Sequence, residues 1–255
     1  MDLTWLGTAG FIIKTKDTEI AFDPFLSRGQ GKPSPFSSKS FENTEAIFVG
    51  HGHFDHTYDI PEIVAGSDLN VFAPGLTGKM LKMRGVPESR LLHTVNDEIL
   101  FKPLKMRAFH SSHVHFDIPL IVSTVKRCGV KGCLHMLPLV TGYPKGLVQT
   151  YFFEVNGKKV LFASTAGCTD RELNIYRKLE IDYFLAPVQG NTDIQEIVAK
   201  QMMIIQPKVI IPHHHDDFYP PLSQEISLGI FRDKLKFLGF KGELLEIPLF
   251  DSSQI

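Results

Sequence analysis

Four side chains that can bind a metal ion fall within one stretch of six residues. His51, His53, Asp55 and His56 form the pattern H-x-H-x-D-H, which directly follows residues 46–49, an apolar run that predicts a buried strand. Neutral imidazole and carboxylate groups are ligands that suit zinc and its first-row neighbours. We therefore expect a metal site where this strand ends.

The other histidines are grouped rather than scattered. The chain contains 11 of them, and nine fall in three groups, at 51/53/56, 110/113/115 and 213/214/215. Each group begins at the end of a predicted strand. Side chains at strand ends are held rigidly, and ligands bind preferentially in the crevices beyond them. The three groups can therefore share one metal centre, although they are far apart in the sequence.

The composition narrows the class of protein. The chain has 255 residues, of which 43% are hydrophobic and 22% are charged, as is typical of a globular protein. No segment has the composition of a linker, so we expect a single domain over residues 1–255. The net charge is −1, which argues against a nucleic-acid partner or an anionic membrane partner.

The cysteines and the apolar runs indicate the compartment. The three cysteines, Cys128, Cys133 and Cys168, do not form a disulfide framework, and we expect reduced thiols. The first residues lack the pattern of a signal peptide, and no apolar run approaches the roughly 18 residues of a membrane span. We therefore expect a cytoplasmic protein.

The order of the predicted elements favours two packed sheets with helices on both outer sides. Asn156-Gly157 is a strong hairpin signal. Thr169 and Thr192 each begin a capping box that opens a helix, and Ser223 is expected to cap the last helix. The strands are expected at 2–6, 11–14, 19–22, 46–49, 70–73, 91–94, 104–109, 150–155, 159–163, 182–186, 208–211 and 244–247.

Two segments lack a clear period. Residues 27–40 are rich in Ser, Gly, Pro and Lys and predict a long polar loop, which is either a lid or a surface excursion. Residues 116–147 contain several prolines and glycines beside apolar positions. We interpret this second segment as an insertion near the mouth of the active site; the alternative is a hairpin with extra turns.

The motifs together resemble those of the metallo-β-lactamase-fold hydrolases, and most nearly the branch that contains ascorbate-6-phosphate lactonase. Asp23-Pro24 after the opening hairpin resembles the first family motif, H-x-H-x-D-H the second, His110 after a strand the third, and Pro212-His213-His214 the last. The resemblance implies a four-layer αββα sandwich of two mixed sheets. It also implies hydrolysis that depends on Zn²⁺, as one or two ions, with Mn²⁺ or iron as alternatives.

The resemblance also implies a ligand set. One ion would be held by His51, His53 and His110, and the second by Asp55, His56 and His214. Asp23 would support these ligands through hydrogen bonds. Within the second histidine group, His113 and His115 compete with His110, which we favour because it directly follows the strand. Side chains alternate along an extended chain, so His213 and His215 are expected to point away from His214.

Ser164 is a departure from the family pattern. The family normally places Gly-Asp-Thr after the hairpin, and its aspartate bridges both metals, whereas Ser164 occupies that position here. Asp170 could substitute only if its loop folds back, and its interpretation as a residue at a helix N-terminus is favoured. The missing carboxylate predicts a weaker second metal site.

The leading functional hypothesis is a hydrolase that acts on a small molecule. Zinc can lower the pKa of a bound water to about 7, and the hydroxide can then attack a carbonyl carbon or a phosphorus. Esters, lactones, amides and phosphodiesters all fit this chemistry. Asp55 would be the catalytic group, orienting the nucleophile or accepting its proton. Weaker candidates for substrate contact or support are His113, Tyr143, Lys145 and Asp216.

Two other functions share the same fold. An iron-dependent redox enzyme would use the open positions of a histidine-rich site, although carboxylates are then usually more numerous. A catalytically reduced protein that binds a metal or senses a ligand is the second alternative, and Ser164 is the residue that favours it. A homo-oligomer is compatible with all three functions.

Overall fold

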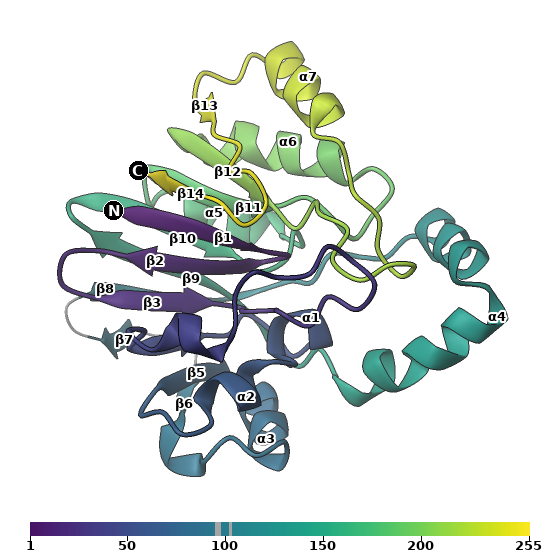
Figure 1. Cartoon of the computed structure of the whole chain (residues 1–255). Helices are drawn as coiled ribbons and strands as arrows, with labels where there is room; N and C mark the ends of the chain where they lie inside the picture. Colours follow the sequence, from purple (N-terminus) through teal and green to yellow (C-terminus); the bar gives the residue numbers. More distant parts are fainter. Residues whose placement is uncertain (95–97, 102–103) are drawn as a thin grey trace.

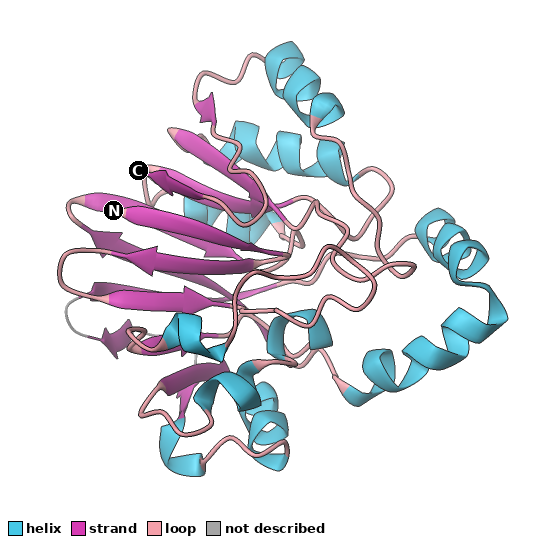
Figure 2. Ribbon diagram, viewed as in Figure 1, coloured by secondary structure: helices cyan, strands magenta, loops and turns pink. Residues whose placement is uncertain are grey.

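Two seven-stranded sheets pack face to face, and helices cover their outer sides (Figures 1 and 2). The computed structural model describes residues 1–94, 98–101 and 104–255. The strand order is β14-β1-β2-β3-β4-β5-β6 in the first sheet and β13-β12-β11-β10-β9-β8-β7 in the second. Both sheets contain parallel and antiparallel pairs. The predicted sandwich of two mixed sheets with flanking helices is confirmed.

The strands are divided between the two sheets as follows. The first sheet is built from β1 (Asp2–Gly7), β2 (Gly10–Lys14), β3 (Glu19–Phe22), β4 (Ala46–Phe48), β5 (Asn70–Pro74), β6 (Leu91–Thr94) and β14 (Ser252–Gln254). The second is built from β7 (Glu98–Phe101), β8 (Leu104–Ser111), β9 (Val148–Val155), β10 (Lys158–Ala163), β11 (Tyr183–Pro187), β12 (Val209–His213) and β13 (Glu243–Leu244). The helices are η1 (Ser38–Phe41), α1 (Phe54–Thr57), α2 (Ile60–Val64), α3 (Gly75–Met83), η2 (Glu88–Arg90), α4 (Ile118–Gly142), α5 (Asp170–Arg177), α6 (Ile194–Ile205) and α7 (Gly229–Leu238).

Parallel pairing brings several strand ends to one edge of each sheet. In the first sheet β3, β4, β5 and β6 run parallel, and in the second β10, β11 and β12 do so. The carboxyl ends of parallel neighbours lie together, so segments that follow them in the sequence become neighbours in space. This arrangement places Asp23 beside His51 in one sheet, and Ser164 and His214 in the other.

A layer of aromatic rings fills the space between the sheets. Phe22 of the first sheet lies 4.6 Å from Phe162 and 5.5 Å from Phe153 of the second, measured between ring centroids. It also stacks on Phe48 of its own sheet at 5.4 Å. All four side chains are fully buried. Such rings combine a large buried apolar area with favourable ring geometry, so this layer fixes the distance between the sheets.

The structure differs from the sequence-based predictions in local details. Residues 118–142 form the long helix α4, bent at Gly129 (φ 61°), which excludes the hairpin that was the alternative interpretation of this segment. Helix α6 is capped at Asp193, one residue after Thr192. Ser223 lies before α7 and not at its start; its hydroxyl donates to Asp217 Oδ1 and accepts from the Tyr219 amide, so it fixes a loop. The edge strands β7 and β14 were not predicted.

The helices do not include a membrane span. Among the described residues, none of the helices combines the length and the apolar character that a bilayer crossing needs.

The aromatic layer predicts a large loss of stability when its central ring is removed. Phe22→Ala should lower the free energy of unfolding by about 3–5 kcal/mol, because it leaves a cavity between two sheets that cannot close independently. Phe237→Ala is the matched control, because that ring is 83% exposed, and it should change the same quantity by less than about 0.5 kcal/mol. Urea unfolding of both variants measures the difference; equal losses would contradict the role of the layer.

Candidate metal centre

Five imidazoles and one buried carboxylate converge beyond the strand ends. His51, His53 and His113 form one group of three, and Asp55, His56 and His214 form a second. Within each group, one candidate ligand atom from every residue lies within 4.8 Å of the others. Residues from three distant parts of the chain therefore meet at one place, as the histidine groups in the sequence predicted.

The first group has the spacing of nitrogen ligands around one ion. His51 Nε2 lies 3.1 Å from His53 Nδ1, and nitrogens that bind one tetrahedral zinc at 2.0–2.1 Å lie about 3.3 Å apart. The His113 ring centroid is 5.0 Å from that of His51 and 4.8 Å from that of His53. The three rings therefore surround a common point.

His113 takes the place that the sequence argument gave to His110. That argument assumed that β8 ends at Phe109, but the strand continues to Ser111, and His110 still pairs with Gln149 of β9. The His110 side chain is exposed and belongs to neither group. The chain leaves the sheet only after Ser111, so His113 is the residue that turns toward His51. Here the prediction of His110 as a ligand was wrong.

Two contacts from the segment after β10 fix the position of His113. The Val114 amide donates to Thr165 Oγ1 at 3.2 Å. Gly167 packs so closely that a Cβ there would lie 2.2 Å from the His113 carbonyl carbon. Only glycine allows this approach. The loop that carries His113 is thus held by β10, which is far away in the sequence.

Four of the five rings have their outer nitrogen held by an oxygen atom. An acceptor on one ring nitrogen fixes the tautomer and leaves the lone pair of the other nitrogen available to a metal. The Nδ1 contacts are His51 with Ser164 Oγ at 2.7 Å, His56 with Asp23 Oδ2 at 2.8 Å, His113 with the Val114 carbonyl at 2.7 Å and His214 with Gln189 Oε1 at 2.7 Å. Gln189 was not identified from the sequence, because it lies in a loop with no motif.

Asp23 occupies the supporting position that the resemblance implied. Its Oδ1 accepts from the Gly50 amide at 2.7 Å, while its Oδ2 contacts His56. The residue is fully buried and has a φ of 37°. Asp23 therefore orients the start and the end of the H-x-H-x-D-H segment together.

The carboxylate of the second group stays charged. Asp55 Oδ2 lies 3.2 Å from His214 Nε2 and 3.5 Å from His56 Nε2. Burial would raise the pKa of Asp55, but the nearby His56 and the hydrogen bond from His214 outweigh burial and hold the pKa well below its usual range. Asp55 therefore supplies an anionic oxygen to this group.

Burial keeps the first group neutral. It lowers the pKa of His53 and of His113 to about 4 each, and it lowers the pKa of His51 well below its usual value, with further lowering from the neighbouring His56. At neutral pH these three rings are therefore unprotonated, which is the form that binds metals.

Ser164 lies between His51 of the first group and His56 of the second. Its Oγ is 2.7 Å from His51 Nδ1 and 3.4 Å from His56 Nδ1. A Cβ at Gly50 would lie only 2.1 Å from the Ser164 Cβ, so the two strand ends touch here. Asp170 does not replace the missing carboxylate, because it is exposed in the first turn of α5 and belongs to neither group.

Asp216 was a weaker candidate for substrate contact or support, and in the structure it has a structural role. It forms a buried ion pair with Arg28, with 2.6 Å between Oδ2 and Nη2, and its Oδ1 accepts from the Thr8 amide at 2.9 Å. His213 and His215 point away from the centre, as expected. His213 stacks on Phe162 in the core, and His215 packs on Trp5.

The two remaining weak candidates, Tyr143 and Lys145, make contacts outside the two metal groups. The Tyr143 ring is buried and packs under the Arg84 guanidinium, whose carbon lies 3.6 Å from the ring centroid. The Lys145 carbonyl accepts from the Gly52 amide at 2.8 Å. Neither residue belongs to a metal group.

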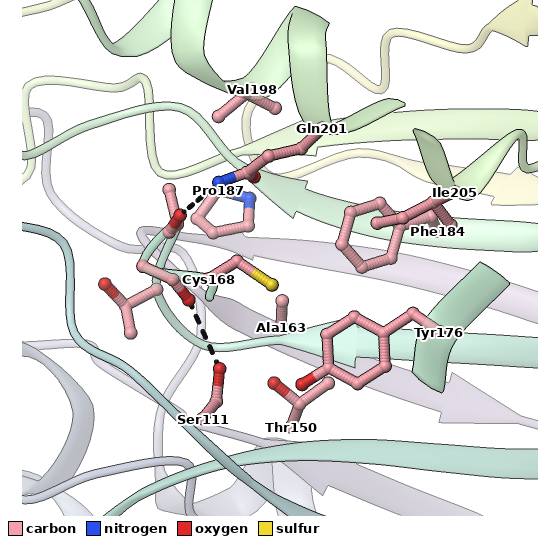
Figure 3. A pocket seen from close by; sticks show the side chains of 13 residues that line it. Ser111, Thr150, Ala163, Cys168, Tyr176, Phe184, Pro187, Val198, Gln201 and Ile205 are labelled. Atoms are coloured by element: carbon pink, nitrogen blue, oxygen red, sulfur yellow. Dashed lines mark hydrogen bonds between the residues drawn. The ribbon is translucent and has the colours of Figure 1, made fainter. Parts of the chain in front are cut away.

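Two cavities were found, and the residues that line them do not include any member of the two metal groups. The one in Figure 3 has a volume of about 10 Å³ and is lined by Cys168, Tyr176 and Thr150 among others, which is about the space of one water molecule. The larger one measures about 400 Å³. Its wall includes Phe54, which stands between two predicted ligands in the sequence, and Tyr219. Only the larger cavity has room for part of a substrate.

Comparisons with known proteins identify the family of the chain. A family model described as a beta-lactamase superfamily domain matches residues 2–214. A UPF0173 metal-dependent hydrolase of Alkaliphilus metalliredigens is 28% identical over 221 residues, which cover 86% of each chain. Another from Salinibacter ruber is 26% identical over 246 residues and 94% of each chain.

A solved structure shares the fold over the whole length. It is Igni18, a metallo hydrolase from the archaeon Ignicoccus hospitalis, with a TM-score of 0.71, 17% identity, and coverage of 100% of this chain and 98% of that one. Because the family model matches far more than half of the chain, the chain belongs to the beta-lactamase superfamily.

Proposed function

We propose that this member of a superfamily of metal-dependent hydrolases cleaves an ester, lactone, amide or phosphodiester bond in a small molecule. Zn²⁺ is the first candidate for its metal, because five imidazoles and one carboxylate form a donor set that suits zinc. Mn²⁺ and iron fit less well, since they favour more oxygen ligands. When bound, zinc supplies a Lewis acid that lowers the pKa of a bound water to about 7.

The observation that supports this proposal is the orientation of the rings. Four imidazoles have Nδ1 held by an oxygen atom and direct Nε2 toward the centre. A binding site that is organised in advance loses little energy to rearrangement when its ligand arrives. His51, His53 and His113 would hold one ion, and Asp55, His56 and His214 a second.

Asp55 has the charge and the position of the group that orients the attacking water. Its carboxylate is ionised, because its pKa is depressed, and its Oδ2 lies between two rings of the second group. An ionised carboxylate accepts a hydrogen bond from water and so directs the water's lone pair at the substrate. The substrate itself would enter from the side of the 400 Å³ cavity.

The two ions are expected to be held unequally. Two divalent ions roughly 3.5–4 Å apart repel each other unless anionic groups lie between them. Asp55 is the one carboxylate in these two groups, and Ser164 supplies only a neutral hydroxyl between them. Asp23 forms a further group with His51 and His56, but its oxygens contact the Gly50 amide and the outer nitrogen of His56. We expect one firmly held ion at the three-histidine group and a second ion that is readily lost.

The reaction class can be tested directly. We expect the isolated protein to contain zinc by elemental analysis and to hydrolyse at least one member of a panel of chromogenic esters, lactones, amides and phosphodiesters. A chelator should abolish the activity, and added Zn²⁺ should restore it. A protein that binds zinc but turns over no substrate in the panel would favour the alternative of a non-catalytic metal-binding protein.

The assignment of His113 predicts a contrast between two variants. His113→Ala should weaken metal binding at least about a hundredfold, because second-layer changes alone cost 10–100-fold at such sites. His110→Ala is the matched control, and it should leave the metal content unchanged. Competition with a chromogenic chelator measures both affinities, and circular dichroism checks that both variants fold. Loss of metal from His110→Ala alone would contradict the assignment.

A further prediction concerns Ser164. Ser164→Asp places an anionic oxygen between the groups, so the metal content should rise toward two ions per chain. Ser164→Asn has a similar size but no charge, and it should not raise the content. Chelator titration with elemental analysis distinguishes the variants. Two equally tight ions in the unmodified protein would show that Ser164 does not weaken the second site.

A further inference from the structure

Helix α4 presents a row of apolar side chains to solvent. In its first segment, before the bend at Gly129, Ile118, Ile121, Val122 and Val125 are 76%, 48%, 45% and 52% exposed. Positions spaced by i, i+3, i+4 and i+7 lie on one side of a helix. The row is therefore a continuous stripe along this segment.

The second segment continues the pattern after the bend. Val130, Leu134 and Leu137, again spaced along one side of the helix, are 78%, 65% and 54% exposed. We call these seven side chains the outer face of α4. Three flanking side chains extend it, each about half exposed: Phe116, Val140 and Leu147.

The opposite side of α4 contacts the rest of the molecule. Arg127 donates to the carbonyls of Pro221 and Leu222, and Met136 is buried. Figure 1 shows α4 standing away from both sheets, beside the loops at the strand ends. The outer face thus has no cover within the described part of the chain, although its helix is firmly attached.

An uncovered face of this size is unusual for a monomer. The ten side chains together expose an area on the order of 1,000 Å², whereas the largest apolar patch of a typical monomer is about 300–600 Å². Most helical stability in proteins comes from packing of the apolar face, and short helices are marginal without it. The outer face of α4 is therefore a candidate for contact with a partner surface.

We propose that a second copy of this chain covers the outer face, so that α4 is the dimerisation helix. A stable interface buries about 800 Å² on each partner, which the exposed area supplies. A two-fold dimer uses the same surface on both subunits, and rows of Ile, Val and Leu pack well against an identical row. Lys126 and Lys131 are exposed and flank the row, as polar residues do at the rim of an interface.

A lipid surface fits these observations less well. Helices that lie on anionic membranes carry many Lys and Arg side chains beside Trp and Phe. Within α4 the cations are Lys126, Arg127 and Lys131, and Arg127 is engaged with the body of the protein. The net charge of the chain is −1, so the molecule as a whole does not carry the strong positive charge that draws proteins to anionic lipid.

The dimer would border the metal centre. The Phe116 ring lies edge-on to His113, with centroids 5.4 Å apart, and is 52% exposed at the start of α4. The second subunit would therefore narrow the approach to the first metal group. This inference stands apart from the reaction class, because it rests on the exposed helix and not on the chemistry of the centre.

Sedimentation velocity across a concentration series tests the proposal. The 255-residue protein should sediment as a dimer. Val125→Glu and Leu134→Glu place a charge in the interface twice per dimer, and each should raise the dimer dissociation constant at least about a hundredfold. Phe237→Glu is the matched control: its ring is 83% exposed on α7, away from α4, and the variant should remain dimeric. Circular dichroism and metal content verify that every variant folds.

The contrary outcomes are distinct. A wild-type protein that is monomeric at all concentrations overturns the proposal, and co-flotation of that monomer with phosphatidylglycerol vesicles would assign the outer face to lipid instead. A dimer that survives both α4 substitutions shows that another surface forms it, which also overturns the proposal. None of these outcomes depends on hydrolytic activity.

Discussion

The metal centre depends on a contact between the ends of two strands in different sheets. Gly50 after β4 and Ser164 after β10 approach so closely that a side chain at Gly50 would collide with Ser164. At this point Asp23 accepts a hydrogen bond from the Gly50 amide and also contacts His56. The aromatic layer around Phe22 sets the separation of the sheets on which this contact relies. The packing between the two sheets therefore stabilises the fold and also sets the geometry of the metal centre.

The sequence predicted the parts of the centre that are local. H-x-H-x-D-H lies in one turn after a strand, and the strand-to-loop transition near Val49 was visible as a change in apolar pattern. The end of β12 was predicted at Ile211, although this strand continues to His213. His113 was not predictable in this way. The length of β8 depends on its pairing with β9, and the position of the loop depends on Thr165 and Gly167. These are contacts between distant residues, which periodicity does not encode.

Helix α4 was missed for a different reason. Gly129 and Pro138 interrupt a pattern that is otherwise helical, and both residues normally indicate the end of a helix. The structure accommodates Gly129 as a bend between two helical segments. The exposure of the apolar side chains in this region could not be predicted either, because sequence patterns assign such residues to the core of the same chain. Their exposure becomes informative only after the core is known to lie elsewhere.

A buried charge pair explains how the polar loop 27–40 contributes to the centre. Arg28 pairs with Asp216, and its Nη2 also donates to the Asp217 carbonyl at 3.2 Å. Gly7 leaves the space for this guanidinium, since a Cβ there would lie 2.4 Å from Nη1. Removing one partner of a buried pair leaves an uncompensated charge, which is strongly unfavourable. Arg28 therefore attaches the start of the loop to the segment that follows β12, which also carries His214.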